Sequence, residues 1–364
     1  MIYDLVIVGG GVAAASALCS LRESSLAICV VSPQMERGDR IGEMLPGAAN
    51  AILRQLGAWD DFLNGGHREA HGFFSAWGSN RLEERSSMMS VAEPGWHLDR
   101  PRFESDLWIA ANRTNATHLP HKLSQISRSE PNWSLRLSNG ECVEARFVLD
   151  CSGRSAVVAR QFSSRVKEDQ LVAAFSFLVQ NQKEVEPTPG ILTESAVDGW
   201  WYSSLLPDGR LVVAYFTDAD LLPKRLTANL SAWDRLIEQT VFTNRRIQSA
   251  GYTADAVPAI TNSSTAYCQP VFGKQWCAAG DAALSLDPLS SHGMTTALWS
   301  GRRAALAIDA FLAGDSEPLE QYAEGMDFGL KRYLSEKRSV YSSEQRFAER
   351  PFWSRRHQSM LPQG

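Results

Sequence analysis

The hydrophobic pattern at the start of the chain predicts a strand, a helix and a second strand. Residues 5–8 form an unbroken apolar run, which is typical of a strand buried in a parallel sheet. Three glycines follow, then an alanine-rich stretch with helical spacing to residue 22 and a second apolar run over residues 27–31. This order predicts a βαβ unit.

Two further helices are expected before the middle of the chain. Residues 48–56 place apolar side chains at helical spacing, and Gly57 follows as a stop signal. Asp99 and Pro101 are typical of a helix start, because a carboxylate caps free N–H groups and proline fits the first turn.

The pattern then changes to strands. The pair Asn139-Gly140 between two alternating runs predicts a hairpin, and its second strand becomes wholly apolar at residues 147–149. Longer alternating strands over residues 161–269 predict a largely antiparallel sheet. Residues 276–279 restore a buried strand, which a loop and a helix follow.

These elements predict an α/β fold built from interleaved segments. A Rossmann-like dinucleotide-binding domain is expected from residues 1–70, 97–160 and 268–312. A mainly antiparallel substrate or partner domain is expected from residues 71–96 and 161–267, and residues 313–364 are expected to form a C-terminal helical segment.

Composition and charge exclude several classes of function. A net charge of −5 argues against a general nucleic-acid-binding surface. The cysteines show no ligand spacing, and His67, His71 and His97 have no companion acids at ligand spacing, so no metal is expected. No apolar run reaches the roughly 18 residues of a membrane span, and a strand rather than a signal peptide begins the chain, so a cytoplasmic location is expected.

The glycines after the first strand point to dinucleotide binding. In the pattern Gly9-x-Gly11-x-x-Ala14, Gly9 permits a tight turn and Gly11 lets the backbone approach a pyrophosphate. Ala14 keeps helix and strand close, and the helix start at Val12 and Ala13 attracts the phosphates. Packing of a glycine-rich strand end is the structural alternative.

The acid that usually binds the ribose is missing. The second strand ends in Val31-Ser32-Pro33, where an aspartate or glutamate would ordinarily stand. Ser32 is a weaker partner and Glu36 follows too late, so cofactor binding is expected to be loose.

A second stretch, GDAALSLDPLSSHGMTTALWSGRRAA, resembles the flavin-binding end of the p-hydroxybenzoate-hydroxylase-like flavoprotein monooxygenases. The resemblance implies that FAD is the cofactor and that Asp281, after Gly280, binds ribityl or ribose hydroxyls. It also implies that N–H groups at Gly293 and Met294, beyond Pro288, lie beside the pyrimidine edge of the flavin. A helix start there would stabilise the negative charge of reduced flavin. A capped helix with no ligand is the structural alternative.

Other motifs extend this resemblance over nearly the whole chain. DCSGRS, with Asp150 and Gly153, resembles the DG motif near the pyrophosphate. RIGEMLPG resembles the GE-x-LPP segment of the flavin halogenase branch, which implies that Glu43 faces the flavin. GWHLDRPRFESDL resembles the LDR segment, whose arginine, Arg100, is implied to lie near the ribityl chain. PFWSRR resembles tail motifs of the same branch.

Two departures argue against halogenation. A tryptophan halogenase relays hypohalous acid through an early lysine, but no lysine precedes Lys122, and the WxWxIP motif is absent. Chain length, the shortened GE-LPG segment and the GWWYSSLLPDGR hairpin resemble the flavoprotein maturases of lysine ε-oxidase and glycine oxidase. This resemblance implies hydroxylation of a tryptophan side chain in a partner oxidase, towards a cysteine tryptophylquinone cofactor.

The resemblance also implies the chemistry. Reduced FAD and O2 would deliver oxygen to an electron-rich ring held in a site that excludes water. Because no second glycine-rich domain follows, NAD(P)H or reduced flavin would act as an external reductant. His292 is a candidate proton donor or acceptor, with an ordinary loop hydrogen bond as the alternative.

A cluster of aromatic residues supplies candidates for a substrate wall, with packing inside a sheet as the alternative. These residues are Trp77, Trp200, Trp201 and Tyr202. Two other functions remain open: hydroxylation of a free small aromatic molecule, and a non-catalytic flavoprotein that binds and stabilises a partner.

Overall fold

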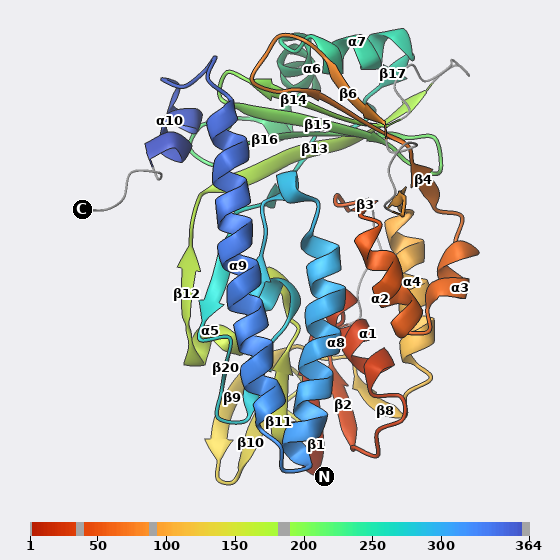
Figure 1. Cartoon of the computed structure of the whole chain (residues 1–364), viewed down its shortest axis with the longest axis vertical. Coiled ribbons are helices and arrows are strands. Elements are labelled where there is room, and N and C mark those ends of the chain that lie inside the picture. Colours follow the sequence, from red (N-terminus) through yellow and green to blue (C-terminus); the bar gives the residue numbers. More distant parts are fainter. Residues whose placement is uncertain (1, 34–39, 87–92, 181–189, 359–364) are drawn as a thin grey trace. The chain divides into compact units, whose positions relative to one another are not determined.

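The computed structural model describes residues 2–33, 40–86, 93–180 and 190–358. The chain forms two compact units. Their strands and helices are labelled in Figure 1. Unit 1 comprises Met1–Gly65, Arg100–Glu168 and Thr265–Lys331, and unit 2 comprises Gly66–Asp99, Asp169–Ser264 and Arg332–Gly364.

Unit 1 is built on a mostly parallel sheet. Its strands are β1 (Ile2–Val8), β2 (Ile28–Val31), β8 (Ala116–Leu119), β9 (Leu123–Ser129), β10 (Asn132–Leu137), β11 (Cys142–Asp150), β20 (Phe272–Gly273) and β21 (Trp276–Ala278). The order β20-β21-β11-β1-β2-β8 places β1 between two parallel neighbours, and β10 pairs antiparallel with β11 as the predicted hairpin. The apolar run of β1 is buried because a central parallel strand is covered on both faces.

Helices cover this sheet. They are α1 (Val12–Ser20), α2 (Ala48–Gln55), α3 (Trp59–Leu63), α4 (Arg100–Ala111), α5 (Ala159–Phe162) and α8 (Gly293–Leu312). Short strands β3 (Met44–Leu45), β12 (Ser164–Lys167), β19 (Ala266–Gln269) and β22 (Leu284–Ser285) complete the unit. Helices α1 and α8 pack closely, and the Ser16 hydroxyl donates to the Leu298 carbonyl at 2.6 Å.

Unit 2 is a largely antiparallel sheet, as the alternating pattern predicts. Its main strands are β5 (Gly72–Ala76), β6 (Glu83–Ser86), β13 (Leu171–Gln180), β14 (Ile191–Ala196), β15 (Gly199–Leu205), β16 (Leu211–Asp218), β17 (Tyr252–Thr253) and β18 (Ala259–Asn262). Helices α6 (Leu230–Glu238) and α7 (Phe242–Ser249) lie over one face, and β4 (Arg68–Ala70) pairs with β7 (Gly95–His97) separately.

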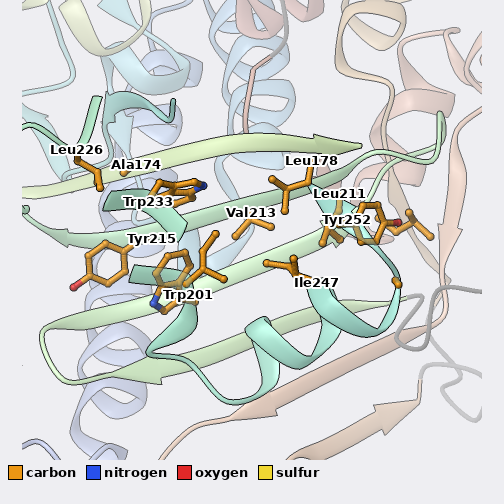
Figure 2. Packing of buried hydrophobic residues seen from close by; sticks show 13 residues of the cluster. Ala174, Leu178, Trp201, Leu211, Val213, Tyr215, Leu226, Trp233, Ile247 and Tyr252 are labelled. Carbon is orange, nitrogen blue, oxygen red and sulfur yellow. The ribbon is translucent and has the colours of Figure 1, made fainter. Parts of the chain in front are cut away.

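The core of unit 2 lies between its sheet and helices α6 and α7. Trp201, Tyr215 and Val213 from the sheet meet Trp233 and Ile247 from the helices, and all five side chains are buried (Figure 2). The Trp233 indole N–H donates to the Ser176 hydroxyl at 2.9 Å, so its polar atom is satisfied inside the core.

The C-terminal segment is not a separate piece. Helix α9 (Glu317–Ser343) begins in unit 1 and ends in unit 2, and α10 (Pro351–Gln358) follows in unit 2. Tyr322 is buried in unit 1 and donates its hydroxyl to the Ala278 carbonyl at 2.6 Å. Trp353 is buried in unit 2 and donates to the Ala196 carbonyl at 2.9 Å. Buried aromatic side chains therefore pack this segment against the core of unit 1 at Tyr322 and against the core of unit 2 at Trp353.

No helix in the described parts of the chain is long and apolar enough to cross a membrane.

Candidate cofactor-binding site

The first turn requires glycine because another backbone segment lies against it. Gly9 has a φ of +117°, and a Cβ built there would lie 2.2 Å from the Cys151 carbonyl oxygen. Any side chain would therefore force the end of β1 away from the loop that follows β11. The Cys151 N–H donates to the Val8 carbonyl at 2.8 Å, which holds this contact in place. The sequence predicts the tight turn, but not the neighbour that enforces it.

Gly11 differs from Gly9 because protein atoms leave space beside it. A Cβ at Gly11 would meet no atom within 4 Å. Gly11 is the N-cap of α1, and no side chain caps this helix. Val12, Ala13 and Ala14 are buried behind it, so the first turn of α1 directs backbone N–H groups outward beside small side chains. This geometry fits a pyrophosphate.

The first turn and the turn at Gly280, each expected to bind the cofactor, lie against each other. A Cβ at Gly280 would lie 2.9 Å from the Cβ of Ala13. The Gly280 N–H donates to the Ser300 hydroxyl at 2.8 Å, which connects the turn after β21 to α8. The first turn, the 280–282 turn and α8 therefore form one contiguous region of unit 1.

The carboxylate of Asp150 is engaged by protein donors. This residue is fully buried, and its Oδ1 accepts hydrogen bonds from the N–H and hydroxyl of Ser152 at 2.9 and 2.5 Å. Its Oδ2 accepts from the N–H groups of Val158 and Ala159, both at 2.8 Å. With four protein donors, the carboxylate shapes the loop that contains Gly153 and abuts Gly9. The carboxylate therefore positions this loop, and its place near the pyrophosphate stays a prediction.

Arg100 has the geometry of a ligand-binding arginine. Its Nη1 donates to the Gly42 carbonyl at 2.5 Å, and its Nη2 donates to the Glu104 carboxylate at 2.5 Å. Its Nε is buried and has no hydrogen-bond partner within the described residues. An unsatisfied buried donor is costly, so a partner supplied by a ligand would offset that cost. The implied location near a ribityl chain fits this feature.

Asp281 lies among cations. Its carboxylate is 3.5 Å from Nε of Arg154, and the Arg165 guanidinium donates to its backbone carbonyl at 3.2 Å. Burial raises the pKa of Asp281, while Arg154, Arg165 and Arg100 act in the opposite direction. Part of the side chain remains accessible, at 34%, so protein surrounds the carboxylate without sealing it. A carboxylate in this setting can accept hydrogen bonds from hydroxyl groups.

The loop before α8 is shaped by its own side chains. Asp287 is buried, and its carboxylate accepts from the Leu289 N–H at 2.9 Å, which caps the short turn that begins at Pro288. His292 is the N-cap of α8 and is exposed, and its imidazole makes no capping hydrogen bond. A Cβ at Gly293 would meet no atom within 4 Å, so the backbone at this helix start is approachable.

The remaining residues expected at the site include Glu43, Met294 and Ser32. Glu43 is 1% exposed, and its carboxylate accepts from the Gly42 N–H at 3.0 Å. Met294 is nearly buried in the first turn of α8. The Ser32 hydroxyl donates to the Pro33 carbonyl at 3.2 Å, and Glu36 lies outside the described residues. The roles of Glu43 and His292 in catalysis stay predictions.

The aromatic residues of unit 2 mostly follow the packing alternative. Trp200 and Trp201 are each 1% exposed. Trp200 stacks on Phe216 at 4.0 Å between ring centroids and donates to the Tyr341 hydroxyl at 3.0 Å. Trp77 packs edge-on against Trp200 and donates to the Val340 carbonyl at 2.9 Å. These contacts fit the packing alternative, and a role of the three indoles in a substrate wall stays a prediction.

Two residues of the site carry no signal of their role in the sequence. Arg154 stands inside DCSGRS, but its proximity to Asp281 appears only in three dimensions. Trp108 donates its indole N–H to the Gly10 carbonyl at 2.8 Å and so anchors the first turn. Its position on α4 carries no local signal, because an interior helical tryptophan normally indicates packing.

Two further features of the described residues bear on ligands. No cluster of His, Cys, Asp or Glu in the described residues is suited to a metal. A cavity of about 700 Å³ lies at the end of α4 and the start of β8, lined by Trp108, Arg113 and His118 among others. It includes none of the predicted site residues. The glycine turn, the open Gly11 and the buried Nε of Arg100, which has no partner among the described residues, are stronger indicators of a cofactor.

Comparisons with known proteins agree with this arrangement. A family model described as tryptophan halogenase matches residues 74–364. The chain is 28% identical to the putative FAD-dependent oxidoreductase LodB of Marinomonas mediterranea, over 98% of this chain and 97% of that protein. It is 25% identical to the tryptophan 2-halogenase of Chondromyces crocatus, over 85% of this chain and 62% of that protein.

Solved structures share the fold. The myxobacterial chondrochloren halogenase CndH matches with a TM-score of 0.86 at 21% identity, over 98% of this chain and 86% of that chain. The peptidyl tryptophan dihydroxylase QhpG, described as essential for tryptophylquinone cofactor biogenesis, matches with a TM-score of 0.78 at 23% identity, over 98% and 79%. The expected Rossmann-like fold with an antiparallel sheet and C-terminal helices is thereby confirmed.

Proposed function

The chain belongs to the tryptophan halogenase family, and from this membership we propose that it is an FAD-dependent monooxygenase that hydroxylates a tryptophan side chain of a partner oxidase. The product would be an intermediate in the formation of a cysteine tryptophylquinone cofactor. The observation that carries this proposal is similarity to LodB along almost the entire chain. The fold shared with QhpG supports it.

The residues of unit 1 would hold FAD. The first turn of α1 at Gly11 would bind the pyrophosphate, and Arg100 and Asp281 would bind the sugar and ribityl groups. The exposed start of α8 at Gly293 would favour negative charge on the pyrimidine side of the flavin. When bound and reduced, FAD supplies the activation of O2. The absence of a ribose-binding acid at Ser32 predicts loose binding.

The proposed reaction balances with one external reductant. Each turnover consumes O2, two electrons and two protons. One oxygen atom enters a C–H bond of the indole ring as a hydroxyl group, and the other leaves as water. NAD(P)H or reduced flavin would supply the two electrons. His292 would donate or accept a proton near the reacting atoms, because it stands exposed at the start of α8.

Halogenation fits the chain less well than hydroxylation. A tryptophan halogenase is expected to require an early lysine, and no lysine occurs before Lys122. Family membership therefore supports the flavin chemistry, while the residues present favour transfer of oxygen rather than halide. The six cysteines are free thiols, which is consistent with the proposed cytoplasmic location.

The test is co-expression with a candidate precursor oxidase, followed by mass analysis of its tryptophan-containing peptides. A gain of one or two oxygen atoms on a tryptophan, reduced when Gly11→Ala weakens flavin binding, supports the proposal. If the partner gains no mass and free phenols or indoles accelerate reductant oxidation, the protein is a small-molecule hydroxylase. If the partner is only stabilised, with no mass gain and no turnover, the role is non-catalytic binding.

A further inference from the structure

The sheet of unit 2 has two faces of different character. Trp201, Tyr215 and Val213 point to the face that α6 and α7 cover (Figure 2). Because side chains alternate along a strand, Tyr202 and Ser204 of β15 belong to the second face. The register pairs Tyr202 with Ala214 of β16, and Ala214 with Phe175 of β13. This row therefore lies across three adjacent strands.

The row on the second face carries half-buried aromatic rings. Phe175 and Tyr202 are only partly buried, in contrast to Trp200 and Trp201 on the same sheet. Their strands are separated by β16, so the backbones lie about 10 Å apart. The small Ala214 stands between them. Two rings at such a spacing can contact the faces or edges of a third aromatic ring, at centroid distances of roughly 4.5–7 Å.

A buried histidine is attached to this second face. Nδ1 of His97 is 2.7 Å from the Ser204 hydroxyl, and both side chains are fully buried. Ser204 is two residues along β15 from Tyr202, about 7 Å at the rise of a strand. Nε2 of His97 is buried without a hydrogen-bond partner among the described residues. Buried polar atoms are almost always paired, so this one needs an explanation.

Charge and burial keep the imidazole neutral. Burial is the largest of the causes that lower the pKa of His97 to about 4, and the cationic groups of Arg68 and Arg246 and the nearby His71 contribute in the same direction. When Nδ1 of the neutral imidazole carries the proton and donates to the Ser204 hydroxyl oxygen, Nε2 is left as a hydrogen-bond acceptor. Such a group can recognise an N–H or O–H without carrying a charge into an apolar site.

We propose that the aromatic group to be hydroxylated packs on Phe175 and Tyr202 and makes a hydrogen bond through its N–H or O–H to Nε2 of His97. This inference deepens the proposed function and rests on it. His97 is then a substrate-binding residue, with Ser204 as its positioning residue. Because His97 is covered in the free protein, binding includes a side-chain movement at this face. The hydrogen bond would form away from water and would discriminate strongly against rings that lack the polar hydrogen.

The test compares two probes on the FAD-loaded protein. N-acetyl-L-tryptophanamide has an indole N–H, and its 1-methylindole counterpart does not. We expect the wild type to bind the first about tenfold more tightly by calorimetry. His97→Leu should remove this discrimination, and Tyr202→Ala should weaken both probes about equally. Phe242→Ala, which removes a half-buried ring from α7 over the opposite face, is the matched control and should change neither affinity.

A second variant guards against loss of folding. In His97→Leu/Ser204→Ala both polar partners become apolar, an exchange that is often nearly neutral for stability. Equal wild-type affinities for the two probes, or discrimination that survives in the His97 variants, would overturn the inference. The two failures are distinguishable. If the wild type discriminates between the probes as expected but no partner tryptophan gains oxygen, the proposed function is wrong. If the wild type hydroxylates a partner tryptophan and the His97 and Tyr202 variants do so equally well, the function stands and only the assigned binding face is wrong.

Discussion

The contrast between Gly9 and Gly11 provides a stringent test of the cofactor site. Both stand in the first turn, and both would gain a single methyl group on substitution by alanine. At Gly11 that methyl group would meet no protein atom within 4 Å. At Gly9 it would lie 2.2 Å from the Cys151 carbonyl oxygen, at a φ of +117°. The same substitution is therefore expected to destabilise the fold at Gly9, whereas at Gly11 it should mainly impair FAD binding.

The magnitudes follow from these geometries. Gly11→Ala should cost at most about 1 kcal/mol of stability, because glycine is only moderately preferred over alanine at an N-cap. Gly9→Ala adds backbone strain of roughly 1–3 kcal/mol to a clash that requires a shift of about 1 Å, for a total of about 3–5 kcal/mol. The shift is resisted because Asp150 holds the opposing loop with four hydrogen bonds.

The affinity for FAD is expected to fall in both variants. A methyl group at Gly11 would occupy the approach of the pyrophosphate, at a cost of about 1–3 kcal/mol, or roughly 5- to 150-fold in affinity. Urea unfolding of the apoprotein and flavin fluorescence titration measure the two quantities independently. If Gly11→Ala binds FAD as tightly as the wild type, the backbone of Gly11 does not approach the cofactor, and the assignment of this turn is wrong.

Three other predictions use buried groups. Asp150→Asn should lower the free energy of unfolding by about 2–4 kcal/mol in urea, because an amide cannot accept all four hydrogen bonds; an unchanged midpoint would contradict the positioning role. Arg100→Lys should weaken FAD binding about tenfold by removing the unpartnered Nε, whereas Arg102→Lys on the same helix should not, and equal titrations would refute the assignment. For His97, whose folded pKa of about 4 lies below the ordinary 6.5, the unfolded chain binds more protons between these values. Wild-type stability should therefore fall by about 3 kcal/mol as pH drops from 6.5 to 4, and His97→Leu should flatten that part of the profile in pH-dependent unfolding.

Much of the architecture is encoded locally. The apolar run of β1, the hairpin at Asn139-Gly140 and the stop at Gly57 are readable because strand, turn and helix preferences act over a few residues. The glycine pattern of the first turn likewise indicates a ligand-binding turn before any contact is known. Sequence patterns were least informative about side-chain surroundings, which depend on segments far away along the chain.

Particular residues show where local information ends. Asp150 stands in a recognisable motif, but only the folded loop reveals that its carboxylate accepts hydrogen bonds from four protein donors. Trp200 and Trp201 are adjacent and both aromatic, and burial on opposite faces of one sheet follows from strand pairing and from what each face meets. The orphan Nε2 of His97 has no local signature at all.

By itself, the sequence determined the order of strands and helices, the interleaved organisation and the two glycine-rich turns, because periodicity and backbone preference are local properties. Only the tertiary structure decided that Gly9 abuts Cys151, that Gly280 reaches Ala13, and that the C-terminal segment divides between two cores. The first two contacts join residues separated by more than a hundred positions. They depend on shape and burial across the whole domain, which no local pattern of residues contains.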